Sequence, residues 1–247
     1  MPLTTVRVLN YQIARVSLLE ATQWCLEDIK DQTPHLLVTI NPEIIIQAKR
    51  KTDLEHALQQ ADLTVADGIG VVWAARQFGH ALPERVPGVE LTTKILEQGG
   101  NTLRVFFLGS KPGTAEKAAL EAQKRYGTRI AGVHHGYFDK EKDAESICQE
   151  VRESKAHLLL AGLGEGQELF LHTHRQAFQI PLMIGVGGTL DVLSGEVQRT
   201  PMWTRQVGLE WAYRVGLDRK RWHRFPRLLQ FVQLVLREKR NTSQPIS

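Results

Sequence analysis

Runs of apolar residues alternate with amphipathic stretches along most of the chain. The runs are short and rich in Val, Leu and Ile, and the stretches between them repeat apolar residues at helical spacing. This alternation is typical of strands and helices arranged around a parallel sheet. The pattern predicts strands at residues 4–9, 35–40, 62–66, 103–108, 128–133, 157–161 and 181–186. It predicts helices at residues 17–31, 42–50, 52–60, 69–79, 88–98, 112–126, 141–154, 165–177 and 188–194.

The pattern changes after about residue 196. Strand-like runs stop there, and Trp, Arg and Leu recur at helical spacing as far as Arg240. We therefore expect a Rossmann-like α/β core over residues 1–196, with a largely parallel sheet flanked by helices. Residues 197–247 are expected to form a basic, aromatic-rich helical appendage.

The two predicted parts differ in charge. The chain has a formal net charge of +4, but residues 199–240 hold 11 Lys/Arg against 3 Asp/Glu, a balance of +8. The remainder has 20 Lys/Arg and 24 Asp/Glu, a balance of −4. A basic segment on a slightly acidic body indicates an acidic partner surface, either anionic lipid or nucleic acid.

The appendage also gathers aromatic residues among its cations, with Trp203, Trp211 and Trp222 interleaved with arginines. Aromatic and cationic side chains together suit the headgroup region of an anionic membrane. No nucleic-acid-binding module is recognisable, so no nucleic-acid partner is expected. The alternative is a pair of amphipathic helices packed on the core with their arginines in solvent, and both can be true together.

Cysteine usage and run lengths indicate the compartment. Only Cys25 and Cys148 occur, far apart and in no C-x-x-C or Cys/His arrangement. Neither a disulfide framework nor a structural zinc site is indicated, which fits a reducing cytoplasm. No run approaches about 18 consecutive apolar residues and no export signal is visible. We therefore expect a cytoplasmic protein that does not span a membrane.

Candidate chemistry lies where strands end, because ligands of open parallel sheets bind beyond the carboxyl ends of the strands. Thr39 and Asn41 stand at one such position, where Asn41 can also be a helix cap. Asp67, followed by Gly68, stands at a second. A carboxylate there can act as a general base toward an attacking sugar hydroxyl, or it can cap the next helix.

Two glycine-rich segments, residues 162–168 and 185–189, follow further strand-like runs. Such turns at helix starts offer backbone N–H groups and a helix dipole to a phosphate. Neither reads G-x-G-x-x-G, and G-x-x-x-x-G-K-[ST] is absent, so dinucleotide and P-loop sites are not supported. Tight turns without a ligand are the alternative.

No metal-binding pattern is visible. D-x-D is absent, and the histidines at 134–135 and at 172 and 174 lack a third partner. We therefore expect no metal or other cofactor, so that arginines or helix N-termini would have to neutralise any phosphate group of a substrate. Arg85, in a proline-bounded loop, suits an anionic substrate, although an exposed surface charge is the alternative.

Eight motifs follow one another along the chain. They are T-I-N-P-E (39–43), A-D-G-I-G-V-V-W-A-A-R (66–76), R-V-P-G-V-E-L (85–91), F-L-G-S-K-P-G (107–113), H-H-G-Y-F (134–138), G-Q-E (166–168), G-V-G-G-T-L-D (185–191) and G-L-E-W-A-Y-R (208–214). By these motifs the sequence resembles the WecG/TagA/CpsF family of bacterial glycosyltransferases, from about Leu36 to Phe231. The second and the last motif are the distinctive ones.

The resemblance implies a reaction and its partners. The reaction is transfer of an N-acetylmannosamine-type or related hexose from a UDP-sugar to an N-acetylglucosamine-diphospho-undecaprenyl lipid. It would invert the anomeric centre without metal, in the synthesis of wall teichoic acid, enterobacterial common antigen or capsule. The implied partners are the UDP-sugar, this polyprenyl-diphosphate-linked acceptor and an anionic membrane surface. The protein would then be peripheral on the inner face of the cell membrane, and a homo-oligomer is possible.

The resemblance also implies roles for single residues. The implied base is Asp67. The implied substrate-binding residues of the core are Thr39, Asn41, Arg85 and Gln167. The family's C-terminal segment is thought to close over the active site at the membrane, which implies that it supplies arginines to the diphosphate. These are Arg214, Arg221 and Arg224.

The sequence departs from the family pattern at three places. The family usually has Pro-Lys where this chain has Glu-Gly at 165–166, Phe-Asp at 190–191 where it has Leu-Asp, and Glu-Pro at 218–219 where it has Asp-Arg. The first difference, which removes a lysine and adds a glutamate next to the pocket, bears on the donor sugar more than on the reaction type. A non-enzymatic Rossmann-like protein that binds nucleotides or polyanions is the competing hypothesis. A glycosyltransferase with a soluble acceptor is a third.

Overall fold

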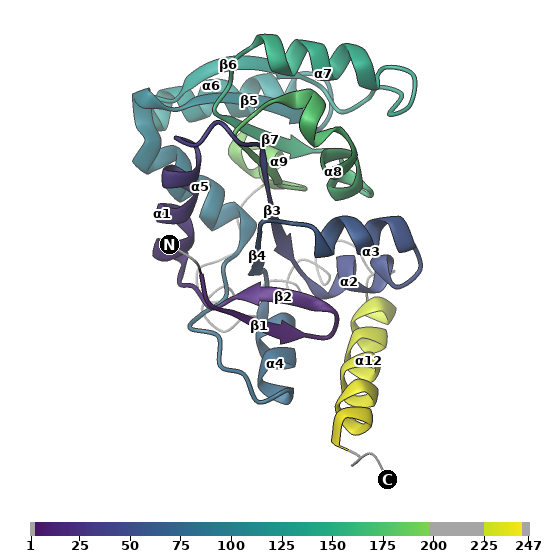
Figure 1. Cartoon of the computed structure of the whole chain (residues 1–247). Helices are drawn as coiled ribbons and strands as arrows, with labels where there is room; N and C mark the ends of the chain where they lie inside the picture. Colours follow the sequence, from purple (N-terminus) through teal and green to yellow (C-terminus); the bar gives the residue numbers. More distant parts are fainter. Residues whose placement is uncertain (1–2, 198–224, 244–247) are drawn as a thin grey trace.

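The structure, a computed structural model, describes residues 3–197 and 225–243. Its centre is a six-stranded sheet whose neighbouring strands all run parallel, in the order β4-β3-β8-β7-β5-β6 (Figure 1). The strands are β3 His35–Ile40, β4 Leu63–Ala66, β5 Arg104–Gly109, β6 Arg129–His134, β7 Leu158–Gly162 and β8 Leu182–Gly185. The α/β fold with a parallel sheet is therefore confirmed.

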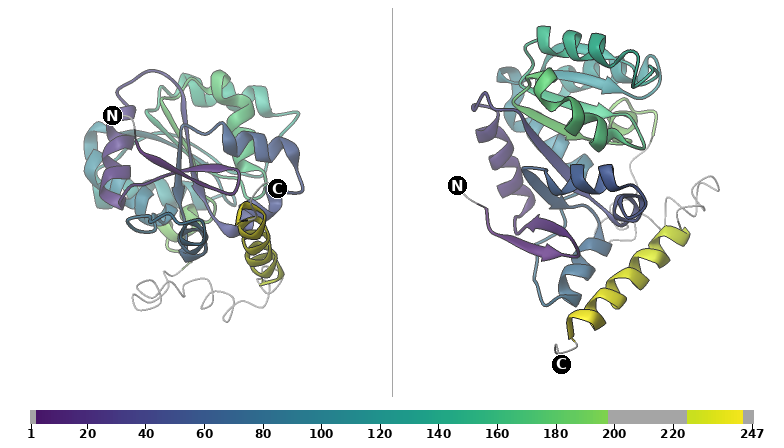
Figure 2. Two further views of the ribbon diagram at one scale, coloured as in Figure 1. Left: turned by 60° about the horizontal axis from the view of Figure 1, so that its bottom comes forward. Right: turned by 45° about the vertical axis from the view of Figure 1, so that its right-hand side comes forward.

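Helices cover both faces of this sheet (Figure 2). They are α1 Leu18–Asp28, α2 Pro42–Ala48, α3 Thr52–Gln59, α4 Ile69–Gln77, α5 Gly88–Gly99, α6 Thr114–Tyr126, α7 Ala144–Glu153, α8 Gln167–Phe178, α9 Thr189–Leu193 and α12 Phe225–Ser243, with a 3-10 turn at Gly100–Thr102. One buried cluster joins the first face to α2, α3, α7 and α8, and a second joins the other face to α1, α5, α6 and α9. Leu36 and Val38 belong to the first cluster and Leu37 to the second, as the alternation of side chains along a strand requires.

The chain reverses its direction across the sheet between two neighbouring strands. From β5 it passes through α6 to β6, whereas from β7 it passes through α8 to β8 on the opposite side. Accordingly α6 and α8 pack on different faces. Ligands of open parallel sheets bind at such a reversal, outside the carboxyl ends of the strands. The strand order therefore favours a ligand site beyond Gly109 and Gly162, the paired last residues of β5 and β7.

The strand predicted at residues 4–9 belongs to a hairpin instead of the central sheet. β1 Thr5–Val8 pairs antiparallel with β2 Tyr11–Ala14, a strand that the apolar runs do not predict. The turn between them has Leu9 at a φ of 55°, a conformation for which glycine or asparagine is the usual sequence signal. Because Leu9 gives no such signal, the hairpin could not be recognised.

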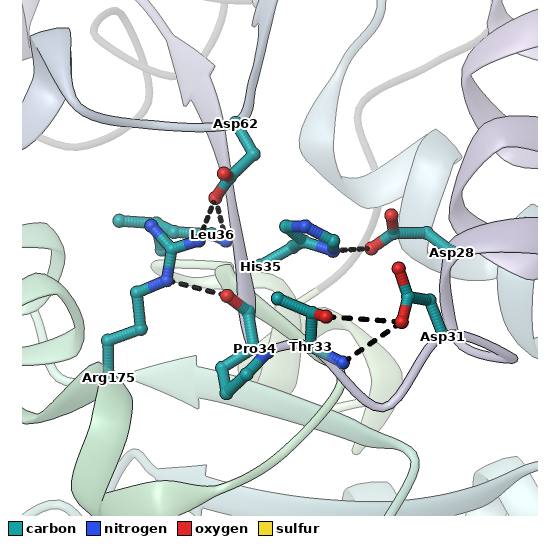
Figure 3. Close-up of polar contacts among 8 residues, drawn as sticks. All are labelled: Asp28, Asp31, Thr33, Pro34, His35, Leu36, Asp62 and Arg175. Carbon is teal, nitrogen blue, oxygen red and sulfur yellow. Dashed lines mark hydrogen bonds and ion pairs between the residues drawn. The ribbon is translucent and has the colours of Figure 1, made fainter. Parts of the chain in front are cut away.

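The amino ends of the strands are fastened by a polar network (Figure 3). The Asp62 carboxylate accepts the N–H of Leu36 at 2.8 Å and pairs with Arg175 of α8 at 2.8 Å. Nearby, Nδ1 of His35 lies 2.8 Å from Asp28. Burial raises the pKa of Asp28, and His35 only partly opposes this rise. This network joins α1, α8 and β4 to β3 at the end of the sheet opposite the candidate residues.

Helix α12 is the described part of the predicted appendage, and it packs on the core. Phe231 and Val235 are buried in the same cluster as α2 and α4. Phe231 meets Pro42 of α2 at Gly70 of α4, where a Cβ would lie 2.6 Å from Pro42 and 3.7 Å from the Phe231 ring. Arg227 adds an ion pair to Glu43 at 2.7 Å. The helical character is confirmed for this part, and the domain boundary near residue 196 stays a prediction.

Candidate functional site

The end of β3 presents Thr39 and Asn41, both half-buried. Asn41 is the N-cap of α2, and its Oδ1 accepts the N–H of Ile44 at 3.1 Å. Pro42 follows in the first helical turn, where a missing N–H costs nothing. The helix-capping alternative for Asn41 is thus confirmed, because its side-chain oxygen caps α2. Its side-chain NH₂ group is the part with which it can donate to a ligand.

Asp67 follows β4 directly and lies beside the end of β3. Its backbone N–H donates to the carbonyl of Ile40 at 2.8 Å, one residue before Asn41. Its side chain is half-buried. The N-cap of α4 is Gly68, at a φ of 96°, so Asp67 does not occupy the cap position that was the alternative for it. Asp67 and Asn41 therefore follow directly after the paired last residues of two adjacent strands, Ala66 and Ile40.

The loop that carries Arg85 is bound to both strand ends. The N–H of Val86 donates to the carbonyl of Ala66 at 2.7 Å, immediately before Asp67. Two residues later Gly88 begins α5 against Thr39, where a Cβ would lie 3.2 Å from the threonine hydroxyl. Arg85 itself is half-buried, not a fully exposed surface charge. This backbone hydrogen bond joins the residue after Arg85 to the residue before Asp67, so the loop of Arg85 lies beside the end of β4.

Gln167 begins α8 and lies over the end of β8. Its Oε1 accepts the N–H of Gly187 at 3.2 Å, and its Nε2 donates to Glu168 at 2.7 Å. A Cβ on Gly185 would lie 2.9 Å from that nitrogen, so the Gln167 amide would have to shift to admit any other residue at the strand end. Glu168 is also buried, and sequence reasoning did not single it out because glutamate is ordinarily an exposed residue. The signal that could have found it is its place in the G-Q-E motif, after a glycine-rich turn.

The turns that follow β5, β6 and β7 touch one another through their backbones. A Cβ on Gly109 would lie 2.4 Å from the carbonyl oxygen of Gly162, and a Cβ on Gly136 would lie 3.0 Å from the Cα of Gly109. Ser110 donates its N–H to Gly162 at 2.9 Å and accepts that of Gly136 at 2.9 Å. Side chains would not fit between these turns. At the carboxyl ends of β5 and β7, where the chain direction reverses, the surface is therefore formed by backbone groups.

Two lysines hold the glycine-rich turn before α8. Lys140 donates to the carbonyls of Leu163 and Glu165, each at 3.1 Å, and burial lowers the pKa of Lys140. The exposed side chain of Glu165 pairs with Lys51 at 2.9 Å. The hydrogen bond from Lys51 lowers the pKa of Glu165. Glu165, which departs from the family pattern, therefore forms its own ion pair with Lys51.

Five of the predicted site residues thus lie along the carboxyl ends of the adjacent strands β4, β3 and β8. They are Thr39, Asn41, Asp67, Arg85 and Gln167. The other three, Arg214, Arg221 and Arg224, lie outside the described residues. Within residues 3–197 and 225–243, no three His, Cys, Asp or Glu side chains are grouped so that they could hold a metal ion. The catalytic or binding role of each residue stays a prediction.

The arrangement combines two kinds of group along one edge. A carboxylate at a strand end can accept a proton from a hydroxyl. Backbone N–H groups at glycine-rich turns and helix starts can bind phosphate oxygens. Such an edge suits transfer of a group from a phosphorylated donor to an alcohol.

Comparison with known proteins assigns a family. The family described as "Glycosyl transferase WecG/TagA/CpsF family" matches residues 6–245. A Bacillus spizizenii protein named N-acetylglucosaminyldiphosphoundecaprenol N-acetyl-beta-D-mannosaminyltransferase is 32% identical over 212 residues, which cover 85% of this chain and 81% of that protein. A Staphylococcus aureus protein of the same name is 34% identical over 206 residues, which cover 83% and 80% of the two chains.

Proposed function

The chain belongs to the WecG/TagA/CpsF family of glycosyltransferases, and from this premise we propose its substrates and its chemistry. The donor is a UDP-sugar that carries an N-acetylmannosamine-type hexose. The acceptor is N-acetylglucosamine linked through diphosphate to undecaprenol, as the names of the relatives say of those proteins. The product is an intermediate in the synthesis of a cell-surface polymer.

One observation supports the chemistry most directly. The end of β4, with Asp67, is bound through backbone hydrogen bonds both to the end of β3 and to the loop of Arg85. In the proposed reaction the Asp67 carboxylate takes the proton of the acceptor hydroxyl while that oxygen attacks the anomeric carbon of the donor. The bond from this carbon to the diphosphate breaks, and UDP departs with the electron pair. A single displacement of this kind inverts the anomeric centre.

The charge of the departing diphosphate must be neutralised as the bond breaks. The glycine-rich turns beyond β5, β7 and β8, and the helix starts that follow them, offer backbone N–H groups for this purpose. Arg85 and the predicted arginines Arg214, Arg221 and Arg224 add positive charge, since guanidinium groups bind phosphate oxygens in pairs. The proposed reaction therefore uses no metal.

A donor and acceptor screen tests this function. The purified protein is incubated with a panel of UDP-hexoses and N-acetylglucosamine-diphospho-lipid, with and without a chelator. We expect transfer from UDP-N-acetylmannosamine or a close relative, with an inverted product and equal rates in both conditions. Binding of UDP without transfer from any UDP-hexose would favour the non-enzymatic alternative. Loss of activity with the chelator would contradict the metal-free reaction.

The lipid acceptor places the proposed reaction at the inner membrane surface. No helix within the described ranges is both long and apolar enough to cross a membrane. Helix α12 exposes 51% of Leu229 and 39% of Leu236, two turns apart, and the exposed Arg237 and Arg240 follow Leu236 in the same helix. Exposed leucines beside cations suit a peripheral contact with anionic lipid. We therefore include such a membrane surface among the partners.

Replacing both leucines tests this contact. We expect Leu229→Ser/Leu236→Ser to weaken binding to phosphatidylglycerol vesicles by about tenfold, because two apolar side chains no longer enter the interface. Vesicle co-sedimentation measures the change. The control is Leu120→Ser on α6, since Leu120 is 60% exposed but far along the chain from α12. Equal binding of all three proteins would remove α12 from the membrane contact.

A further inference from the structure

Glu168 is the one charged residue that the structure buries among residues 3–197 and 225–243, with 8% of its surface exposed. It stands in the first turn of α8, where the helix dipole favours a negative charge. Burial raises the pKa of Glu168, while its hydrogen bond with Gln167 and the charge of Lys140 oppose that rise. Burying a carboxyl group costs free energy unless the group is hydrogen-bonded. The contacts of Glu168 therefore matter for its role.

Those contacts form a short chain of hydrogen bonds. Oε1 of Glu168 accepts from Nε2 of Gln167 at 2.7 Å, and Oε1 of Gln167 accepts from the N–H of Gly187 at 3.2 Å. The Glu168 carboxyl lies against the nitrogen side of the glutamine amide and accepts a hydrogen bond from it. The N–H of Gly187 can only donate, so it selects the oxygen side. The two contacts therefore fix which way the Gln167 amide is turned.

The surroundings leave this pair little freedom. A Cβ on Gly185 would lie 2.9 Å from Nε2 of Gln167 and 3.0 Å from Oε1 of Glu168, so both side chains lie directly over the end of β8. Lys140 crosses from the turn after β6 to bind the carbonyls of Leu163 and Glu165 in the turn before α8. The start of α8 and the turn after β8 are thus joined by side chains, and Glu168 is the buried end of that connection.

We propose that Glu168 is a positioning residue for donor binding, which acts through Gln167 on the glycine-rich turn at Gly187. This inference rests on the proposed function, because it assumes that the turn after β8 receives the UDP-sugar. Glu168 does not touch the substrate. It holds the Gln167 amide, whose oxygen accepts the N–H of Gly187, and so keeps the turn after β8 in one arrangement for the donor.

The main test replaces Glu168 by a residue that cannot accept a hydrogen bond. We expect Glu168→Leu to raise the KM for the UDP-sugar and the Kd for UDP by about tenfold, the usual effect of losing a hydrogen bond to a charged group. The kcat at saturating donor and the KM for the lipid acceptor are expected to change less than about twofold. Glu168→Gln, whose amide oxygen can still accept from Gln167, is expected to restore most of the donor affinity.

A double mutant separates positioning from simple destabilisation. If Glu168 acts through Gln167, then Glu168→Leu has no further effect on donor affinity in a Gln167→Leu background. The control is Glu97→Gln, because Glu97 is exposed on α5 and paired with Lys94. It is expected to leave the donor KM within about twofold. Circular dichroism and the unfolding midpoint of each variant show whether it is folded at the assay temperature.

The outcomes are distinguishable. Wild-type protein that transfers no sugar overturns the proposed function. Wild-type protein that transfers sugar, together with a folded Glu168→Leu variant that binds donor normally, overturns the positioning role. Additive losses in the double mutant overturn it as well, because Glu168 would then act independently of Gln167.

Discussion

Asp67→Asn is expected to lower kcat for sugar transfer by about 100- to 10,000-fold, the range that a positioned general base contributes. Asparagine keeps the size and the polarity of the side chain, but it cannot take a proton from the acceptor hydroxyl. The KM for the donor should change little, because donor binding depends on other groups. Steady-state kinetics with the lipid-linked acceptor measures both quantities.

Asp62→Asn is the matched control for Asp67→Asn. Asp62 precedes β4 and Asp67 follows it, so the two carboxylates stand at opposite ends of the same strand. Asp62 binds Leu36 and Arg175, and its loss is expected to lower the free energy of unfolding by about 1–3 kcal/mol. Its kcat should stay near that of the wild type at temperatures where the variant is folded. An Asp67→Asn enzyme that keeps half of the wild-type kcat would show that another group is the base.

Gly109→Ala is expected to lower the free energy of unfolding by about 3–5 kcal/mol and to impair UDP binding in whatever folded protein remains. Gly109 has a φ of 135°, which L side chains rarely adopt. A Cβ would also lie 2.4 Å from the carbonyl oxygen of Gly162, a backbone atom that cannot turn aside. Urea unfolding followed by circular dichroism measures the loss.

Gly79→Ala is the control that separates the strain of a positive φ from the clash of a new Cβ with the backbone. Gly79 has a φ of 80° but nothing within 4 Å of its Cβ position, so the substitution adds backbone strain without a clash. We expect a loss of about 1–2 kcal/mol and unchanged UDP binding. If Gly109→Ala costs no more than Gly79→Ala, the turns after β5 and β7 are not tightly packed.

Most of the core could be predicted because its strands are buried on both faces. A segment such as Leu158–Gly162 is entirely buried and reads as an uninterrupted apolar run. The hairpin β1–β2 was missed in part because Tyr11–Ala14 is short and its turn at Leu9 lacks glycine. Strand order was beyond the sequence as well, since periodicity reports which side chains are buried and not which strands are neighbours.

The candidate site followed from a rule about strand ends, and that rule has a limit. It found Asp67 and Asn41 because polar residues directly after an apolar run are visible in the sequence. It could not find Glu168, whose burial depends on the approach of Gln167 and of the turn after β8. It also could not show that Glu165 pairs with Lys51 of a distant segment.

The strand order sets the distance between Asp67, at the end of β4, and the point where the chain direction reverses. Adjacent strands lie about 4.8 Å apart, so three strand spacings, about 14 Å, separate the end of β4 from the end of β7 beside the chain reversal (Figure 1). A donor whose nucleotide sits at the reversal and whose sugar reaches Asp67 must bridge that gap in an extended form. A hexose 1-phosphate cannot occupy both ends at once. In the proposed function, the three strand spacings therefore favour a nucleotide-linked sugar as the donor over a shorter activated sugar.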